Sequence, residues 1–126
     1  MVIEQALFHI VDGQQMAFEK KFYELSDIFR NAQGCEKFKL IRGIENPQNY
    51  VLQIHWTDLA IHTDVFMKTE EFQHWFIAMK PFLARKIEMQ HFENTLVVFW
   101  CVMQRVPFTT VFIMRKVIQY AEYSGA

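Results

Sequence analysis

The sequence predicts an α+β domain whose elements follow the order β-α-β-β-α-β. Two observations support this order. Short segments with a period of two residues, typical of strands, alternate with segments whose apolar residues recur every three or four positions, as on one face of a helix. The chain has 126 residues, of which 52% are hydrophobic and 21% charged, so it is long enough for one domain with a sizeable core.

The first strand and the first helix follow one another directly. The strand is expected over residues 2–11, where a few polar residues interrupt an apolar run, and Asp12-Gly13 ends it as a turn. The helix is expected over residues 14–32, and Gly34 suits the left-handed backbone position that closes such a helix. The apolar residues that predict it lie on one helical face: Phe18, Phe22, Leu25, Phe29 and Ala32.

A hairpin and a last strand supply the remaining strands. Residues 36–44 and 50–56 each alternate between apolar and polar positions, and residues 46–49 form the turn between them. Residues 86–94 alternate again. We therefore expect two paired strands in the middle of the domain and a fourth strand at its end.

Two helices are predicted between the hairpin and the last strand. Thr57 or Asp58 caps a short helix that ends near Met67. Thr69 begins a longer helix, which Pro81 ends or bends. The residues of this helix that we expect to face inward are Phe72, Trp75, Phe76, Met79 and Leu83.

This order of elements is that of the split β-α-β, or ferredoxin-like, fold. In that fold the sheet order is 4-1-3-2, all neighbouring strands are antiparallel, and the helices cover one face. The first strand, however, is apolar on both of its sides. Because a sheet that is apolar on both faces needs a second cover, we expect a homodimer packed sheet to sheet.

The C-terminal part of the chain differs from the rest in composition. We assign residues 1–95 to the ferredoxin-like domain and residues 96–126 to a mostly apolar extension. A strand-like segment followed by a helix over Thr109–Tyr123 is expected there, packed on its own domain or across the dimer. Gln104, Arg105 and Pro107 interrupt the apolar run, so we expect no membrane span.

Charge and cysteine content exclude several classes of protein. The net charge is −1, from 13 basic and 14 acidic residues, and no block of one sign is present, which argues against nucleic-acid binding through charge. Cys35 and Cys101 are the only cysteines and have no metal-binding spacing, so we expect no metal site. Two isolated thiols and no visible signal peptide favour the cytoplasm.

A set of spaced features resembles a known family. The features are Gly34-Cys35 at the start of the second strand, Asn46-Pro47 in the hairpin, the strand Tyr50–Ile54 with Trp56 at its end, Ala60, and a helix from Glu71-Phe72 to Lys80-Pro81. With them, residues 1–95 resemble the antibiotic biosynthesis monooxygenase family of dimeric α+β barrels. The extension has no counterpart in this resemblance.

The resemblance implies a small oxygenase that uses neither a metal nor a flavin. The best-known members take a quinol, an anthrone or a similar electron-rich aromatic, remove a proton, and let the anion react directly with O₂. Val65 stands where the family often carries a His. Haem-degrading relatives use an Asn and a His where this chain has Ala6 and Phe76 or Ile77, so we do not expect haem degradation.

His62 and Trp56 are the first candidates for chemistry. His62 shares the apolar side of its helix with Leu59 and Phe66, and an imidazole with an unperturbed pKa of ~6.5 is suited to accept a substrate proton. The alternative is a half-buried His with its hydrogen bonds satisfied. Trp56 is either a pocket wall or an ordinary core residue.

Two further histidines lie on neighbouring predicted strands. His9 and His55 lie on strands that the topology makes neighbours, and we expect them to form a polar cluster on the sheet face away from the helices.

The sequence thus predicts a monooxygenase, independent of cofactors, for a small electron-rich aromatic or quinol. His62 is the predicted catalytic base, and the predicted substrate-binding residues are Trp56, Phe66, Phe72 and Trp75. The alternatives are a non-catalytic ligand-binding or structural dimer module of the same fold, and a tail that anchors the protein to a membrane or a partner.

Overall fold

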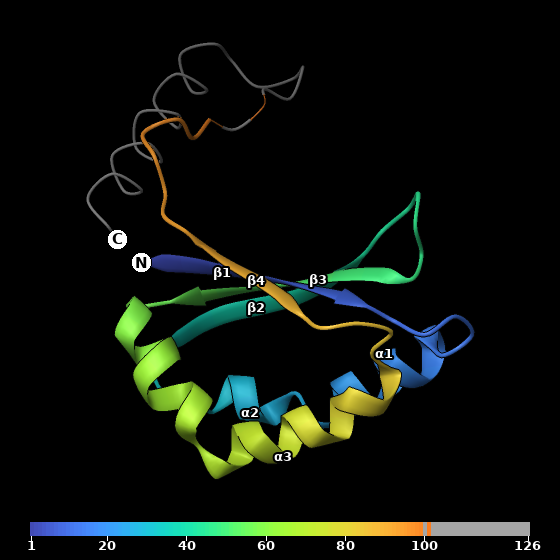
Figure 1. Cartoon of the computed structure of the whole chain (residues 1–126). Helices are drawn as coiled ribbons and strands as arrows, with labels where there is room; N and C mark the ends of the chain where they lie inside the picture. Colours follow the sequence, from blue (N-terminus) through green and yellow to red (C-terminus); the bar gives the residue numbers. More distant parts are fainter. Residues whose placement is uncertain (100, 102–126) are drawn as a thin grey trace. The chain divides into compact units, whose positions relative to one another are not determined.

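Four antiparallel strands form one sheet in the computed structural model, which describes residues 1–99 and 101 (Figure 1). The strands are β1 (Val2–His9), β2 (Cys35–Arg42), β3 (Asn49–Trp56) and β4 (Glu88–Phe92). Their order across the sheet is β2-β3-β1-β4, and each neighbouring pair is antiparallel. This result confirms the predicted ferredoxin-like fold.

The α-helices of the first 92 residues cover one face of the sheet (Figure 1). They are α1 (Gln15–Glu24), α2 (Asp27–Arg30) and α3 (Glu70–Met79). The prediction of one continuous helix over residues 14–32 is wrong, because the chain breaks at Ser26. The hydroxyl of Ser26 donates to the carbonyl of Tyr23 at 2.8 Å and competes with the backbone for that acceptor. The helical face is kept across the break, since Phe18, Phe22 and Phe29 are all buried.

Gly34 closes this helical region, as predicted. Its φ of 80° lies in the left-handed region, which a residue with a side chain rarely adopts. A Cβ atom at this position would lie 2.7 Å from Cγ2 of Ile61. Both the backbone and the packing therefore require glycine here.

The connection between β3 and α3 turns two side chains inward. The carboxylate of Asp58 accepts hydrogen bonds from the backbone N–H groups of Ala60 and Ile61, at 2.6 and 3.3 Å, and so caps the segment as predicted. A π-helical turn, Ile61–Val65, and a 3-10 turn, Phe66–Lys68, follow. These turns bury His62 and Phe66 together. The Thr69 hydroxyl then accepts from the N–H of Phe72 at 3.1 Å, which confirms the predicted cap of α3.

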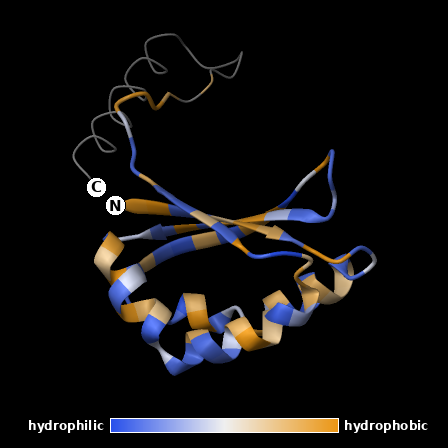
Figure 2. Cartoon of the chain, in the orientation of Figure 1, coloured by the Kyte–Doolittle hydropathy of each residue, from blue (hydrophilic) through white to orange (hydrophobic). Residues whose placement is uncertain are grey.

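The core lies between the sheet and the helices and is largely aromatic. Alternate positions of β1 and β3 point into it, and Figure 2 shows apolar residues alternating with polar ones along the strands. The rings of Phe29 and Trp75 meet edge to face, with centroids 5.3 Å apart. The large side chains buried there include Phe8, Phe18, Phe22, Phe29, Tyr50, Leu52, Ile54, Trp56, Phe66 and Trp75.

The other face of the sheet carries no helix within residues 1–92 (Figure 1). It mixes polar and apolar side chains at the alternate strand positions, and we call it the open face. Its apolar members are Ile3, Leu7, Ile41, Val51 and Phe92. Ile41 and Phe92 are each 44% exposed. A homodimer through this face stays a prediction.

The chain divides into two compact units, Met1–Phe92 and Glu93–Ala126. Residues 93–99 and 101 of the second unit contain neither helix nor strand. The helix predicted over Thr109–Tyr123, and the packing predicted for the extension, lie outside the described residues. Within the part of the chain that the structure describes, no helix has the length and apolar character that crossing a bilayer requires.

Candidate active site

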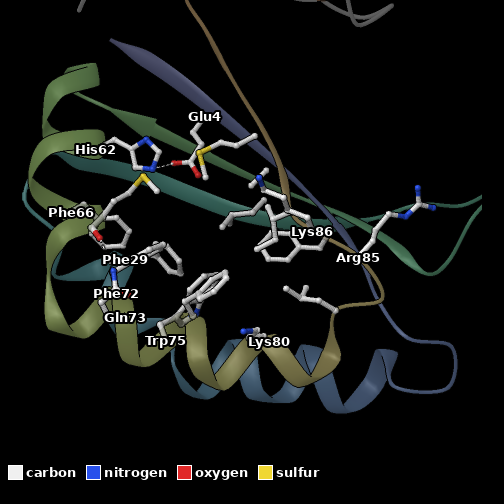
Figure 3. A pocket seen from close by; sticks show the side chains of 18 residues that line it. Glu4, Phe29, His62, Phe66, Phe72, Gln73, Trp75, Lys80, Arg85 and Lys86 are labelled. Atoms are coloured by element: carbon white, nitrogen blue, oxygen red, sulfur yellow. Dashed lines mark hydrogen bonds and ion pairs between the residues drawn. The ribbon is translucent and has the colours of Figure 1, made fainter.

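A cavity of about 730 Å³ lies between the sheet and α3, entirely within the first unit (Figure 3). This volume is typical of sites for small molecules. Its walls are mainly aromatic and aliphatic, from β1, β3, β4 and the helices. The apolar lining residues are Ala6, Phe8, Phe29, Leu52, Phe66, Met67, Phe72, Trp75, Phe76, Leu83, Ile87 and Met89.

Among the described residues, one carboxyl group lines this cavity, that of Glu4 on β1. Glu4 is 3% exposed, and its Oε2 atom accepts a hydrogen bond from Nε1–H of Trp56 at 2.8 Å. Burial raises the pKa of Glu4 from 4.5 to about 7, because the ionised form loses its hydration, and the indole hydrogen bond offsets part of this rise. At neutral pH this carboxyl group can therefore both give and take a proton.

His62 lies beside Glu4 at the same end of the cavity (Figure 3). Its Nε2 atom is 3.1 Å from Oε2 of Glu4, and its ring stacks on Trp56 with an interplanar angle of 17°. Burial lowers the pKa of His62 to about 4, and the positive charge of His91 contributes to the lowering. The imidazole is therefore uncharged at neutral pH.

His91 on β4 extends this arrangement into a chain of three groups. It lies opposite Glu4 in the β1–β4 register, and its Nε2 atom is 2.9 Å from Nδ1 of His62. With Glu4 ionised, His62 donates to Glu4 and accepts from His91. With Glu4 protonated, both hydrogen bonds can run in the opposite direction. A proton can thus be held on Glu4 or on His91, at either end of this row of three side chains, without breaking a contact.

Positive charge lines another part of the cavity. Lys80 follows α3, and Arg85 and Lys86 lie in the segment before β4; all three belong to the lining. Within the described residues none of them forms an ion pair. The polar lining of the cavity thus contains the Glu4–His62 pair, Gln73 and these three basic residues.

Four of the five residues predicted for the site line this cavity: His62, Phe66, Phe72 and Trp75. Trp56 is not among the lining residues. It is fully buried behind Glu4 and supplies the hydrogen bond that this carboxyl group accepts. The structure therefore places Trp56 as a support for Glu4 rather than as a wall.

Sequence reasoning missed Glu4, although a signal was present. Glu4 shares its strand face with Ala6, Phe8 and Ile10, which are all buried. A charged residue at a buried position of an apolar strand is uncommon unless it is paired or functional. The contact of Glu4 with His62 has no such signal, because the two residues are far apart in the sequence.

The predicted cluster of His9 with His55 is not formed. In the β1–β3 register His9 lies opposite Asn49, whereas His55 lies opposite Ile3, at the other end of the strands. His9 instead contacts Oδ1 of Asn49 at 2.9 Å and Glu88 at 3.3 Å. The neighbouring strands were predicted correctly, but antiparallel pairing separates these two residues along them.

The cavity, the fold and the sequence together define the class of protein. The family model described as antibiotic biosynthesis monooxygenase matches residues 1–77. The chain belongs to this family, as the resemblance had implied.

One relative and two solved structures are similar to this chain. YczJ, an uncharacterised protein of Bacillus subtilis (strain 168), is 29% identical over 94 residues, which cover 75% of this chain and 99% of YczJ. A Bordetella bronchiseptica structure solved as a candidate antibiotic biosynthesis monooxygenase has a TM-score of 0.72 and 26% identity, over 75% of this chain and 96% of its own. SnoaB, a cofactor-independent oxygenase from Streptomyces nogalater, shares the fold, with a TM-score of 0.64 and 20% identity over 74% of this chain and 91% of SnoaB.

Proposed function

We propose that this protein is a cofactor-independent monooxygenase that oxidises a small electron-rich aromatic or quinol with O₂. Family membership supports an oxygenase in general, and SnoaB is an oxygenase of this fold that needs no cofactor. The observation that carries the proposal is the buried pair of Glu4 and His62 at one end of an aromatic cavity. A base with a pKa near neutrality, shielded from water, is what removal of a substrate proton requires.

Glu4 and His62 form the base together in this proposal. The raised pKa of Glu4, about 7, gives its carboxylate the basicity to accept a substrate proton. His62, which the sequence predicted as the base, has a lowered pKa and is a weaker acceptor by itself. Its 3.1 Å contact with Oε2 lets the imidazole share the proton that Glu4 receives. Trp56 holds the carboxyl group in place through its indole N–H.

In the proposed reaction the substrate carries an activated CH₂ group between aromatic rings, as in an anthrone. The base removes one C–H proton, and the resulting anion transfers one electron to O₂. The carbon radical and superoxide combine through a new C–O bond, and the peroxide takes up a proton. Loss of water, with the second hydrogen of the CH₂ group, leaves a ketone. One oxygen atom ends in the product and the other in water.

The aromatic walls suit a flat substrate. Phe66, Phe72 and Trp75 lie against one another, with centroid separations of 5.3 Å between Phe66 and Phe72 and 5.9 Å between Phe72 and Trp75. Their faces and edges can pack on a ring system and keep bulk water from the anion. We propose these three residues as the substrate-binding wall.

Position 65 bears on the role of His62. Val65, where the family often carries a His, is 46% exposed and is not a lining residue of the cavity. The imidazole that reaches the cavity comes instead from position 62, on the same π-helical turn. This placement supports His62 as the imidazole of the proposed site.

Oxygen uptake by the full chain, treated with a chelator, tests this function. The protein is offered a panel of quinols, anthrones and catechols, and we expect uptake above the protein-free rate with formation of a quinone or hydroxylated product. The variant His62→Gln should lower the rate, with circular dichroism as the check that it folds. Binding without uptake across the panel would instead favour a non-catalytic ligand-binding module.

We also propose that two copies of the chain associate through the open face, in the cytoplasm, where the free thiols of Cys35 and Cys101 stay reduced. Replacing Leu7 on this face with lysine should convert a dimer to a monomer in light scattering. Met16→Lys is the matched control, because Met16 is 83% exposed on α1. A monomeric parent chain would refute this association.

A further inference from the structure

The contacts of His62 continue from the buried carboxyl group of Glu4 to the edge of the sheet. Nε2 of His62 lies 3.1 Å from Oε2 of Glu4, a contact drawn in Figure 3, and Nδ1 of the same ring lies 2.9 Å from Nε2 of His91. Glu4 and His62 are buried, whereas His91 is exposed on β4, which forms one edge of the sheet. A row of three titratable side chains therefore joins the cavity to water.

A proton can pass along this row while every side chain keeps its position. Protonated Glu4 gives its proton to Nε2 of His62, and the Nδ1–H of His62 passes to Nε2 of His91. Glu4 is left as a carboxylate, His62 in its other neutral tautomer and His91 as an imidazolium, so that protons and charges balance.

The middle ring of the row needs no charge for this transfer, because it receives one proton as it gives up another. Burial lowers the pKa of His62 to about 4, and the positive charge of His91 contributes to the lowering. An imidazolium at His62 is therefore disfavoured at neutral pH, whereas a change of tautomer is not. The surroundings of His62 suit a group that passes a proton on rather than one that holds it.

We propose that His91 is the outer end of a proton relay, which takes the proton of Glu4 through His62 and holds it beside water. The inference deepens the proposed function and rests on it for the use of the relay in turnover. His91 is not a lining residue of the cavity, so it acts on a substrate only through the other two groups. The relay leaves Glu4 ionised, which is the form that can accept a substrate proton.

Such a relay matters because Glu4 titrates near neutral pH inside a closed site. Burial raises the pKa of Glu4 to about 7, so that without a relay about half of the chains would hold it protonated at that pH. Glu4 is 3% exposed, and a ligand in the cavity covers it further. Histidine is the side chain suited to take up charge in this range of pH, and His91 is in contact with water.

The other titratable groups around the row differ from it in kind. Burial raises the pKa of the Cys35 thiol on β2 to about 11, and the charges of Glu4 and Glu36 add to this rise. Asp64, on the turn that carries His62, is exposed. The remaining titratable residues of the lining are basic: Lys80, Arg85 and Lys86. A proton shared between the two nitrogens of His62 therefore reports on Glu4 and His91.

Nitrogen-15 NMR of the histidine rings in the full chain tests the relay without a substrate. In the parent chain the proton of His62 should be shared between Nδ1 and Nε2, so that their two shifts approach each other between about pH 6 and 8. His91→Phe keeps a ring at this exposed position but removes the acceptor for Nδ1–H, and His62 should then stay in its Nε2–H form. Glu4→Gln should have the same effect, because an amide does not ionise. His74→Phe, at an exposed position of α3, is the matched control and should behave as the parent chain does.

The pH profile of oxygen uptake tests the use of the relay in turnover. His91→Gln can keep a hydrogen bond to His62 but cannot hold the proton. Its kcat should fall about 10-fold between about pH 8 and 6, as the ionised fraction of a carboxyl group with a pKa of about 7 does, and that of the parent chain only about 2- to 3-fold. The two kcat values should be nearly equal at the alkaline end, where Glu4 is ionised in both. A purely structural role of His91 would lower kcat by the same factor at every pH.

The outcomes separate the relay from the proposed function. A single tautomer of His62 in the parent chain, or the same pH profile for the parent chain and His91→Gln, would overturn the relay and leave the oxygenase in place. A shared proton at His62 that depends on His91, without oxygen uptake from any panel compound, would support the relay and remove the oxygenase. Circular dichroism checks that each variant folds.

Discussion

Two glutamate–histidine pairs lie on opposite faces of the same sheet. On the covered face, Glu4 and His62 are 3.1 Å apart, with side chains 4% and 1% exposed. On the open face, Glu88 and His9 are 3.3 Å apart, but the Glu88 side chain is 62% exposed. The residue types and distances are nearly the same, and His9 is also buried, with its side chain 10% exposed, so that the two pairs differ in the exposure of the carboxyl group.

The difference teaches that burial, rather than pairing, prepares a carboxyl group for proton transfer. Glu4 is shielded on the covered face, and the loss of hydration raises its pKa to about 7. Water surrounds Glu88, so that its pair with His9 is screened and contributes little to stability. The sequence does not distinguish the two pairs, because each consists of one Glu and one His residue.

The largest expected effect is a loss of catalytic rate when Glu4, but not Glu88, is replaced. Glu4→Gln keeps the shape of the side chain but removes the base, so kcat for oxygen uptake should fall by about 10²–10⁴-fold, the usual contribution of a general base. Glu88→Gln should leave kcat unchanged. Steady-state oxygen consumption with the best substrate of the panel measures both. Equal losses in the two variants would contradict the assignment of Glu4.

Removing the indole hydrogen bond tests what holds Glu4 in place. Trp56→Phe should lower the free energy of unfolding by about 2–4 kcal/mol, from lost packing and from a buried carboxyl group left without a donor. It should also raise the pKa of Glu4 further, because the indole N–H lowers it. Urea unfolding measures the first effect.

Trp75→Phe is the matched control for this variant. Trp75 is 4% exposed, and its indole nitrogen has no hydrogen-bond partner within the described residues. The variant Trp75→Phe should therefore lose packing alone and lower the free energy of unfolding by less than Trp56→Phe does. If Trp75→Phe lowered the free energy of unfolding by as much as Trp56→Phe or more, the hydrogen bond from Trp56 to Glu4 would contribute nothing to stability.

The pH dependence of stability should show the two buried groups opposing each other. Glu4, raised from 4.5 to about 7, keeps a proton in the folded state that the unfolded chain loses, so the free energy of unfolding falls as pH rises between these values. His62, lowered from 6.5 to about 4, is uncharged in the folded state while the unfolded chain binds a proton. The free energy of unfolding therefore rises with pH from about 4 to 6.5.

Single variants should uncover these two contributions. In the parent chain the contributions of Glu4 and His62 should cancel between pH 4.5 and 6.5, so that the two groups give the free energy of unfolding no net dependence on pH there. Glu4→Gln should leave a free energy of unfolding that rises with pH, and His62→Gln one that falls, each by up to about 1.4 kcal/mol per pH unit. Urea unfolding at several pH values measures the slopes. Slopes of the same sign in both variants would contradict the opposed shifts.

The smallest effect is expected on the open face. Glu88→Gln should change the free energy of unfolding by less than about 1 kcal/mol, because the Glu88 carboxylate is exposed and its interaction with His9 is screened by water and salt. His9 keeps its 2.9 Å contact with Asn49 in this variant. A larger loss in urea unfolding would mean that the open face is shielded from water in solution.

The elements of the fold could be read from the sequence, because they depend on local periodicity. Alternation predicted three of the four strands, an apolar run with a few polar residues predicted the first, and the order of elements predicted the sheet order β2-β3-β1-β4. Capping residues predicted local structure equally well, as Asp58 and Thr69 show. The break at Ser26 was missed, since a serine hydroxyl can either leave a helix intact or compete for its carbonyl groups.

The candidate site could be predicted only in part. Phe72 and Trp75 face inward as expected, because helical spacing fixes which residues of α3 do so, and their role in binding a substrate stays a prediction. Trp56 was expected as a wall, yet it supports Glu4 from behind. Aromatic residues of the core and of a pocket have the same sequence pattern, so that only their neighbours in space distinguish them.

The sequence by itself determined which segments are strands and helices, and which face of each is apolar. Only the tertiary structure decided that Glu4, His62 and His91 form one chain of contacts, because these residues come from β1, a π-helical turn and β4. It also decided the pKa of Glu4, since the loss of hydration depends on everything that packs around a group. Local patterns record the preferences of neighbouring residues, whereas a buried site is made by residues that folding brings together.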